Sequence, residues 1–156
     1  MKIVIDTLLE KVLIAILSIM LFSVIWQVFS RFILQSPSTL TDEISSFSLI
    51  WLGLLGATYA TGKQLHLAID LIPSSVVNKR PLLYNGIVHL SVFLFGLLVM
   101  LIGGARLCWL TFLFEQKSAT LEIPLGYIYL VVPISGLLVC YYSIYTLLKS
   151  TKKLKA

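Results

Sequence analysis

Four long stretches without Asp, Glu, Lys or Arg constrain the fold of this chain more than any other feature of its sequence. Crossing about 30 Å of hydrocarbon takes roughly 20 helical residues, and none of the stretches shows the two-residue alternation of a barrel strand. The sequence therefore predicts an all-α integral membrane protein, with a single membrane domain over residues 1–156. The charge-free stretches cover residues 12–30, 44–62, 82–105 and 123–148, and the four transmembrane helices are expected at about residues 12–34, 43–62, 82–106 and 123–148.

The overall composition excludes an ordinary soluble domain. Hydrophobic residues make up 58% of the chain and charged residues only 12%, and the mean hydropathy is +0.97. Soluble domains carry about 25% charged residues. The first apolar stretch is longer than the core of a secretory signal peptide, and no A-x-A-like cleavage site follows it, so we expect it to remain as a membrane anchor.

Most of the twelve Lys and Arg residues fall on one side of a four-helix arrangement. Cytoplasmic flanks of transmembrane helices collect these residues, so both termini are predicted to be cytoplasmic. The net charge of +5 is then largely a topology signal and gives no support to nucleic-acid binding. The basic tail is expected to face anionic phospholipids. The cytoplasmic set is Lys2, Lys11, Lys63, Lys79, Arg80, Lys149, Lys152, Lys153 and Lys155, and the outer set is Arg31, Arg106 and Lys117.

Side chains that carry chemistry are sparse in this sequence. Ionisable residues deep in a membrane are kept only for a function, and none of the acidic residues lies in mid-span, so we do not expect this chain to translocate a substrate alone. No Cys/His cluster has zinc spacing, and no phosphate-binding loop or Ser/His/Asp set can be assembled. The chain is therefore predicted not to be an enzyme, to have no catalytic residue and to bind no cofactor or metal itself.

The connection between the second and third stretches, residues 63–81, is too short and too polar to cross the membrane. Its segment LHLAIDLIPSSVV carries His66 and Asp70 among apolar residues, a pattern typical of a short interfacial segment. A haem held by His66 and His89 would need both imidazoles at one depth. His66 is expected at the interface and His89 about 10 Å inside, so a hydrogen-bonded helix histidine is favoured at position 89.

The outer turn between the first two helices carries opposite charges. Asp42 and Glu43 open the second helix, where carboxylates favour the positive end of the helix dipole. Arg31 closes the first helix near the same surface. Two alternatives stay open for this arginine: an ion pair across the turn, or snorkelling to lipid headgroups.

The second stretch contains positions suited to packing. Gly53 with Ala57, and Gly56 with Ala60, form small-x-x-x-small pairs that let another helix approach closely, either within this chain or on a partner. Trp51 lies eight residues into the stretch, which is deep enough to predict a protein contact. Elsewhere, Cys108 and Cys140 are expected at different depths and therefore as buried free thiols. Such thiols pack as small hydrophobic side chains.

Two segments carry a resemblance to a known family. They are WQVFSRFIL at residues 26–34 and TDEISSFSLIWLGLLGATYATGKQLHLAID at residues 41–70. Together they resemble the small membrane subunit, the DctQ or Q component, of tripartite ATP-independent periplasmic (TRAP) transporters. The second half of the chain matches only in hydropathy. In this resemblance Arg31, Asp42 and Glu43 match an outer-edge motif, and His66 and Asp70 match an inner segment, with structural or interface roles.

The resemblance implies a scaffold role in sodium-driven, secondary active uptake of an organic acid across the bacterial inner membrane. A large multi-span membrane subunit, paired one-to-one with this chain, would carry substrate and sodium ions, and a periplasmic substrate-binding protein would deliver the acid. Likeness favours sialic acid over C4-dicarboxylates. The alternative from another class is a haem-bearing or bare membrane anchor subunit of a respiratory enzyme complex, and a self-sufficient small exporter is a third possibility.

Overall fold

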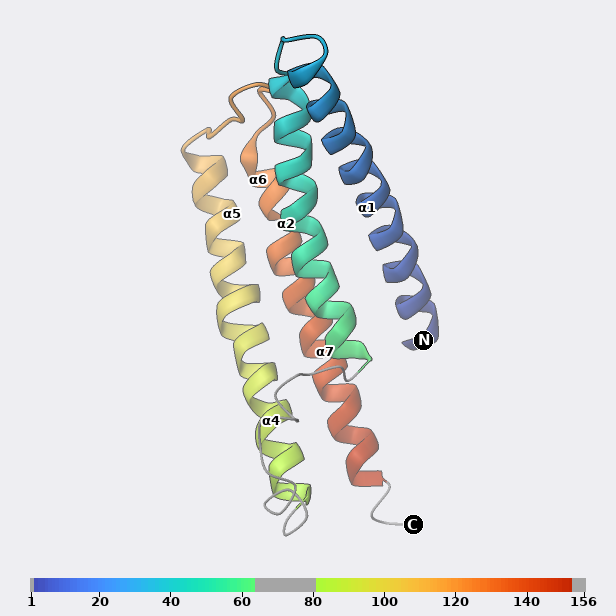
Figure 1. Ribbon diagram of the computed structural model, residues 1–156. Helices are drawn as coiled ribbons and strands as arrows, with labels where there is room; N and C mark the ends of the chain where they lie inside the picture. The colour runs from blue at the N-terminus through green and yellow to red at the C-terminus, as the bar shows by residue number, and fades with distance from the viewer. Residues whose placement is uncertain (1, 64–80, 153–156) are drawn as a thin grey trace.

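The computed structural model describes residues 2–63 and 81–152, with side chains over residues 2–63 and 86–148. Within these ranges the backbone is mostly helical and forms no strand. The helices run side by side as an elongated bundle (Figure 1). In chain order they are α1 (Lys2–Phe32), α2 (Thr39–Gly62), α4 (Pro81–Phe95), the π-helix η2 (Gly96–Gly103), α5 (Gly104–Leu113), α6 (Leu125–Tyr129) and α7 (Val131–Lys152).

Four helical segments are long and apolar enough to cross a membrane. Because a helix satisfies its own backbone hydrogen bonds, such segments are stable in hydrocarbon, and large apolar side chains cover their outer faces. The predicted fold class is confirmed: the protein is an all-α, multi-pass membrane protein. The four spans are Lys2–Phe32, Thr39–Gly62, Gly86–Leu113 and Leu125–Leu148.

The helices extend past the charge-free stretches. α1 begins at Lys2 rather than near residue 12, and the third span passes Arg106 and ends at Leu113. Glu10, Lys11 and Arg106 in these extensions are exposed. A helix can therefore continue into the headgroup region while its charged side chains reach water.

The fourth span is interrupted between α6 and α7, at Leu130. Pro133 has no N–H, and its ring clashes with the carbonyl four residues earlier, so a regular helix cannot run through Tyr129. At this irregularity the indole Nε1 of Trp51 donates a hydrogen bond of 3.0 Å to the Ile128 carbonyl. The interruption thus leaves a carbonyl that forms a hydrogen bond between α2 and the fourth span.

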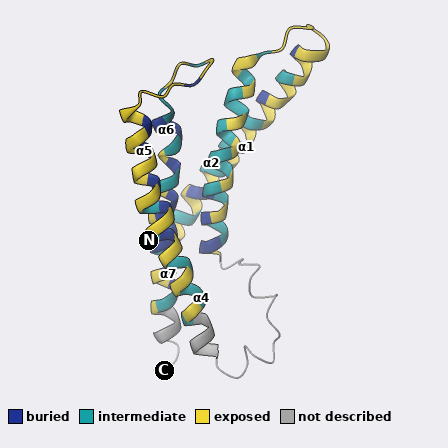
Figure 2. Cartoon of the chain, turned by 90° about the vertical axis from the view of Figure 1, so that its left-hand side faces the viewer, coloured by how far each residue is buried: buried dark blue, intermediate teal, exposed yellow. Residues whose placement is uncertain are grey.

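α7 lies at the centre of the packing. Of the apolar window in its span, 44% is buried inside the chain, against 6% in α1. Figures 1 and 2 show α2 on one side of α7 and the α4–η2–α5 helix on the other, with α1 packed on α2. The buried core cluster is Leu9, Leu55, Val131 and Tyr142.

Backbone atoms of α7 and η2 come into close contact at Gly136. A Cβ at this position would lie 2.8 Å from the Leu101 nitrogen and 3.0 Å from the Gly96 carbonyl oxygen. Small residues commonly allow such close approach between membrane helices. Cys108 and Cys140 are buried and unpaired, as predicted.

Candidate subunit interface

One side of α2 points away from the rest of the chain. Asp42, Ser46, Leu49, Gly53 and Ala57 follow one another at helical spacing and are all exposed. Gly56 and Ala60 are half-buried on the same side. We call these seven residues the α2 face.

Nothing in the described part of the chain packs directly against the two central glycines of the α2 face. A Cβ added to Gly53 or to Gly56 would meet nothing within 4 Å. Gly62, at the end of the same helix, is different, because a Cβ there would lie 2.8 Å from the ring of the buried Tyr142. The chain therefore uses Gly62 for its own packing and leaves Gly53 and Gly56 open to another helix.

Glu43 fastens the outer end of α2 to the loop between α5 and α6. Its carboxylate accepts hydrogen bonds from the Ser118 hydroxyl, from the Thr120 amide at 2.9 Å and from the Leu121 amide at 3.0 Å. Charge-assisted hydrogen bonds of this kind are about twice as strong as neutral ones. One side chain thus holds both the hydroxyl and two successive amides of the loop.

The loop that Glu43 holds is itself a tight hairpin. The Ser118 amide donates to the Ile123 carbonyl at 2.9 Å, and the Leu125 amide donates to the Gln116 carbonyl at 2.9 Å. Glu115 and Glu122 adopt left-handed backbone angles, with φ of 49° and 54°. Non-glycine residues rarely take this conformation. Both glutamates are exposed, so the hairpin presents two carboxylates at the outer end of the bundle.

Of the two alternatives for Arg31, the ion pair across the turn does not form among the residues that the structure describes. Asp42 instead accepts a hydrogen bond of 2.7 Å from the Gln27 amide nitrogen, and Glu43 is occupied by the loop. Arg31 is exposed in the last turn of α1, which fits the snorkelling alternative.

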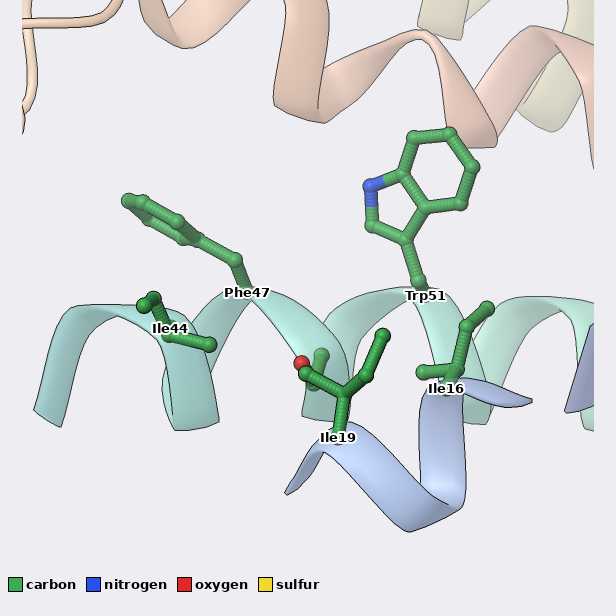
Figure 3. Close-up of a pocket in the computed structure, with 6 residues that line it drawn as sticks. Ile16, Ile19, Ile44, Phe47 and Trp51 are labelled. Atoms are coloured by element: carbon green, nitrogen blue, oxygen red, sulfur yellow. The ribbon is translucent and has the colours of Figure 1, made fainter. Parts of the chain in front are cut away.

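Trp51 makes an internal contact and also lines an apolar groove of about 330 Å³. Figure 3 shows Ile16 and Ile19 of α1 beside Trp51 and Phe47 of α2, with Ile44 nearby. The groove lining contains no carboxylate, imidazole or thiol. It therefore offers a packing surface without groups for acid–base chemistry.

The remaining predicted positions add no second site. His66 and Asp70 lie outside the described residues. The structure therefore does not test whether His66 could hold a haem. His89 is half-buried in α4. Over residues 2–63 and 81–152, no three His, Cys, Asp or Glu residues lie close enough together to hold a metal ion. The predicted positions thus direct attention to two surfaces, the α2 face and the hairpin that Glu43 holds.

The role of Glu43 predicts a local effect of its replacement. We expect Glu43→Ala to release the hairpin, because the Thr120 and Leu121 amides lose their acceptor. Hydrogen–deuterium exchange of these two amides should become faster, while exchange in α7 stays unchanged. Asp42→Ala is the matched control, since Asp42 contacts Gln27 and not the loop. Equal protection of both amides in wild type and Glu43→Ala would contradict this role.

Comparison with known proteins gives the class of this chain. A sequence profile of the DctQ component of tripartite ATP-independent periplasmic transporters matches residues 20–153. A Haemophilus influenzae protein that carries the name TRAP transporter small permease protein is 36% identical over 73 residues, which span 47% of this chain and 43% of the relative.

The profile covers more than half of the chain, including the second half, where the resemblance by motif was weakest. The family is a transporter component and not an enzyme, so the prediction that the chain is not an enzyme is confirmed. The chain belongs to the DctQ component family of TRAP transporters.

Proposed function

We propose that this chain is the stationary small subunit of a TRAP transporter and packs through its α2 face, one-to-one, on the large membrane subunit. The observation that carries the proposal is the pair of open glycines, Gly53 and Gly56, on an exposed side of α2. Without a hydrophobic driving force in lipid, membrane helices associate through close van der Waals packing at small residues. Family membership supplies a partner with helices to fill this surface.

Affinity purification of the tagged chain from its native membrane in mild detergent tests this assignment. The expected result is a single large multi-span protein at one-to-one stoichiometry by mass. Recovery of a soluble flavin or iron–sulfur protein, with a stoichiometric haem absorbance band, would instead establish the anchor subunit of a respiratory complex. Recovery of no partner, together with transport in liposomes containing only this chain, would establish a small exporter.

The proposed location is the bacterial inner membrane, with both termini in the cytoplasm. The start of α1 and the end of α7 lie toward one end of the bundle, and the α1–α2 and α5–α6 connections lie at the other (Figure 1). The excess of Lys and Arg near the termini supports a cytoplasmic orientation of that end. A C-terminal alkaline phosphatase fusion is expected to be inactive, and a fusion inserted in the α5–α6 loop is expected to be active.

The outer hairpin is proposed to help dock the periplasmic substrate-binding protein. Its exposed carboxylates, Glu115 and Glu122, stand on a loop that Glu43 fixes to α2. We expect Glu115→Lys/Glu122→Lys to slow docking and uptake by roughly tenfold at low salt, because rim charges mainly set association rates. Glu10→Lys, an exposed reversal near the start of α1, is the control. Unchanged docking in the double variant would remove the hairpin from the interface.

The transport reaction itself is assigned to the partner. We propose sodium-driven uptake of an organic acid, with sodium and substrate on the large subunit, while this chain resists tilting of the stationary part as the substrate-carrying part moves. The absence of charged residues from residues 12–30 and 44–62 supports this division of labour. Uptake of sialic acid against succinate, with and without a sodium gradient, tests the substrate class. The likeness of residues 26–70 favours sialic acid.

A further inference from the structure

A polar pocket of about 270 Å³ lies at the end of the bundle opposite the hairpin. Three helices form it: the first turns of α1, the end of α2 and the last part of α7. Its lining includes Lys2, Asp6, Lys63, Tyr145 and Thr146. We call it the basal pocket.

Aromatic rings hold the two lysines of the basal pocket. The Lys2 ammonium lies 5.4 Å from the centroid of the Tyr145 ring and 5.9 Å from that of Tyr142. The Lys63 ammonium lies 5.3 Å from the centroid of the Tyr59 ring. A cation–π contact positions an ammonium group without neutralising it. The ammonium groups therefore keep the charge and the N–H donors needed for an anionic ligand.

The one carboxylate in the pocket lining is already engaged. Asp6 accepts a hydrogen bond of 2.5 Å from the phenol of the buried Tyr142. Within the described residues, neither lysine forms an ion pair with Asp6 or with another acid. Two lysines and one aspartate leave the pocket with an excess of positive charge.

Hydroxyl donors complete the lining. Thr146 is only 8% exposed, yet its side chain lines the pocket and makes no hydrogen bond within the described part of the chain. Tyr145, one residue earlier on α7, also belongs to the lining, and its ring contacts Lys2. Ammonium and hydroxyl groups converging from separate helices are the donors that a phosphate group requires.

The depth of the basal pocket matches that of a phospholipid headgroup. Lys63 is the first charged residue after the apolar stretch 44–62, and Tyr145 and Thr146 lie in the last turn of the stretch that ends at Leu148. This is the boundary between hydrocarbon and headgroups, where aromatic residues gather. Ile3, 79% exposed at the rim, offers an apolar contact to an acyl chain.

We propose that the basal pocket binds the phosphate-bearing headgroup of an anionic phospholipid, with Lys2 and Lys63 as its cationic contacts and Thr146 as a hydroxyl donor. Basic pockets between transmembrane helices are known to hold such headgroups. The bound lipid bridges the start of α1 to the ends of α2 and α7. The inference is independent of the transport role, because it concerns contacts within this chain.

Native mass spectrometry of the full chain in mild detergent tests the proposal, with phosphatidylglycerol as the probe and phosphatidylcholine as the neutral comparison. We expect preferential retention of phosphatidylglycerol. Lys2→Gln/Lys63→Gln should lower its affinity by roughly 25-fold, about fivefold for each lysine, and Lys2→Arg/Lys63→Arg should retain it. Thr146→Val should weaken binding without a change in net charge.

The matched control is Lys11→Gln/Arg106→Gln, which removes the same charge from exposed positions outside the pocket. Its affinity for phosphatidylglycerol should stay within about twofold of wild type. An equal loss in this control would mean diffuse charge attraction and would overturn the proposal, as would unchanged binding by Lys2→Gln/Lys63→Gln. Complete displacement of the lipid by equimolar inorganic phosphate would make the basal pocket a free-phosphate site and overturn the lipid assignment.

Discussion

Gly53→Leu is expected to release the large membrane subunit while leaving the fold of this chain intact. A Cβ at this position would have nothing within 4 Å and the residue is exposed, so a leucine side chain there can extend away from the rest of the chain. On a partner helix packed against the α2 face it would create overpacking, which typically destabilises a packed contact by about 1–3 kcal/mol. Association should therefore weaken by roughly 5- to 150-fold.

Co-purification yield measures this effect, and the helical content and thermal stability of the isolated chain provide the test of intactness. Gly86→Leu is the matched control, because Gly86 on α4 also has open space around its Cα. We expect Gly86→Leu to retain the partner. If both variants lost the partner equally, the contact would not be specific to α2, and if neither did, the α2 face would face lipid.

Gly136→Ala is expected to have the opposite signature and destabilise the chain itself. The added methyl group would lie 2.8 Å from the Leu101 nitrogen and 3.0 Å from the Gly96 carbonyl oxygen. These are backbone atoms that cannot rotate away, so α7 and η2 must separate. Overpacking of this kind costs about 1–3 kcal/mol, whereas glycine to alanine in an unhindered helix is favourable by up to about 1 kcal/mol.

Thermal unfolding in detergent, followed by circular dichroism, measures the change. Gly103→Ala is the control within η2, since its nearest contact is the Leu98 carbonyl oxygen at 3.7 Å, an ordinary van der Waals distance. We expect Gly103→Ala to unfold at the wild-type temperature or slightly above it. A Gly136→Ala variant as stable as Gly103→Ala would mean that the close contact of α7 and η2 relaxes at no cost.

The four spans were predictable because charge-free length is a local property of the sequence. The interruption of the fourth span near Pro133 is predictable as well, because proline disturbs a helix wherever it occurs. The hydrogen bond from Trp51 to the Ile128 carbonyl is not predictable, because it depends on how α2 and α6 are placed. The π-helix Gly96–Gly103 has no comparable signal. Two residues of this π-helix, Gly96 and Leu101, lie against Gly136 of α7. Its irregular geometry therefore occurs where the two helices pack closely.

The candidate site likewise has features that the sequence indicated and features that only the structure shows. The sequence identified Gly53 and Gly56 as packing positions, but their spacing alone left open whether the chain itself would fill them. Only the arrangement of the helices shows that it does not. The bond between Glu43 and Ser118 joins residues 75 positions apart, so no local pattern could have indicated it. The sequence left two alternatives open for Arg31, because proximity in a turn does not determine which donor an acidic side chain will bind.

The central position of α7 has a consequence for biogenesis. During synthesis the first three spans emerge before α7, which supplies Val131 and Tyr142 to a core cluster with Leu9 of α1 and Leu55 of α2. Until then α1 and α2 have chiefly each other as protein neighbours, and the third span lacks the contacts that α4 and η2 make with α7. A chain truncated before residue 131 would keep three hydrophobic spans capable of inserting, but without the element around which they assemble. Membrane insertion and correct folding are thus separate events in this protein, and the second waits for the last helix to be translated.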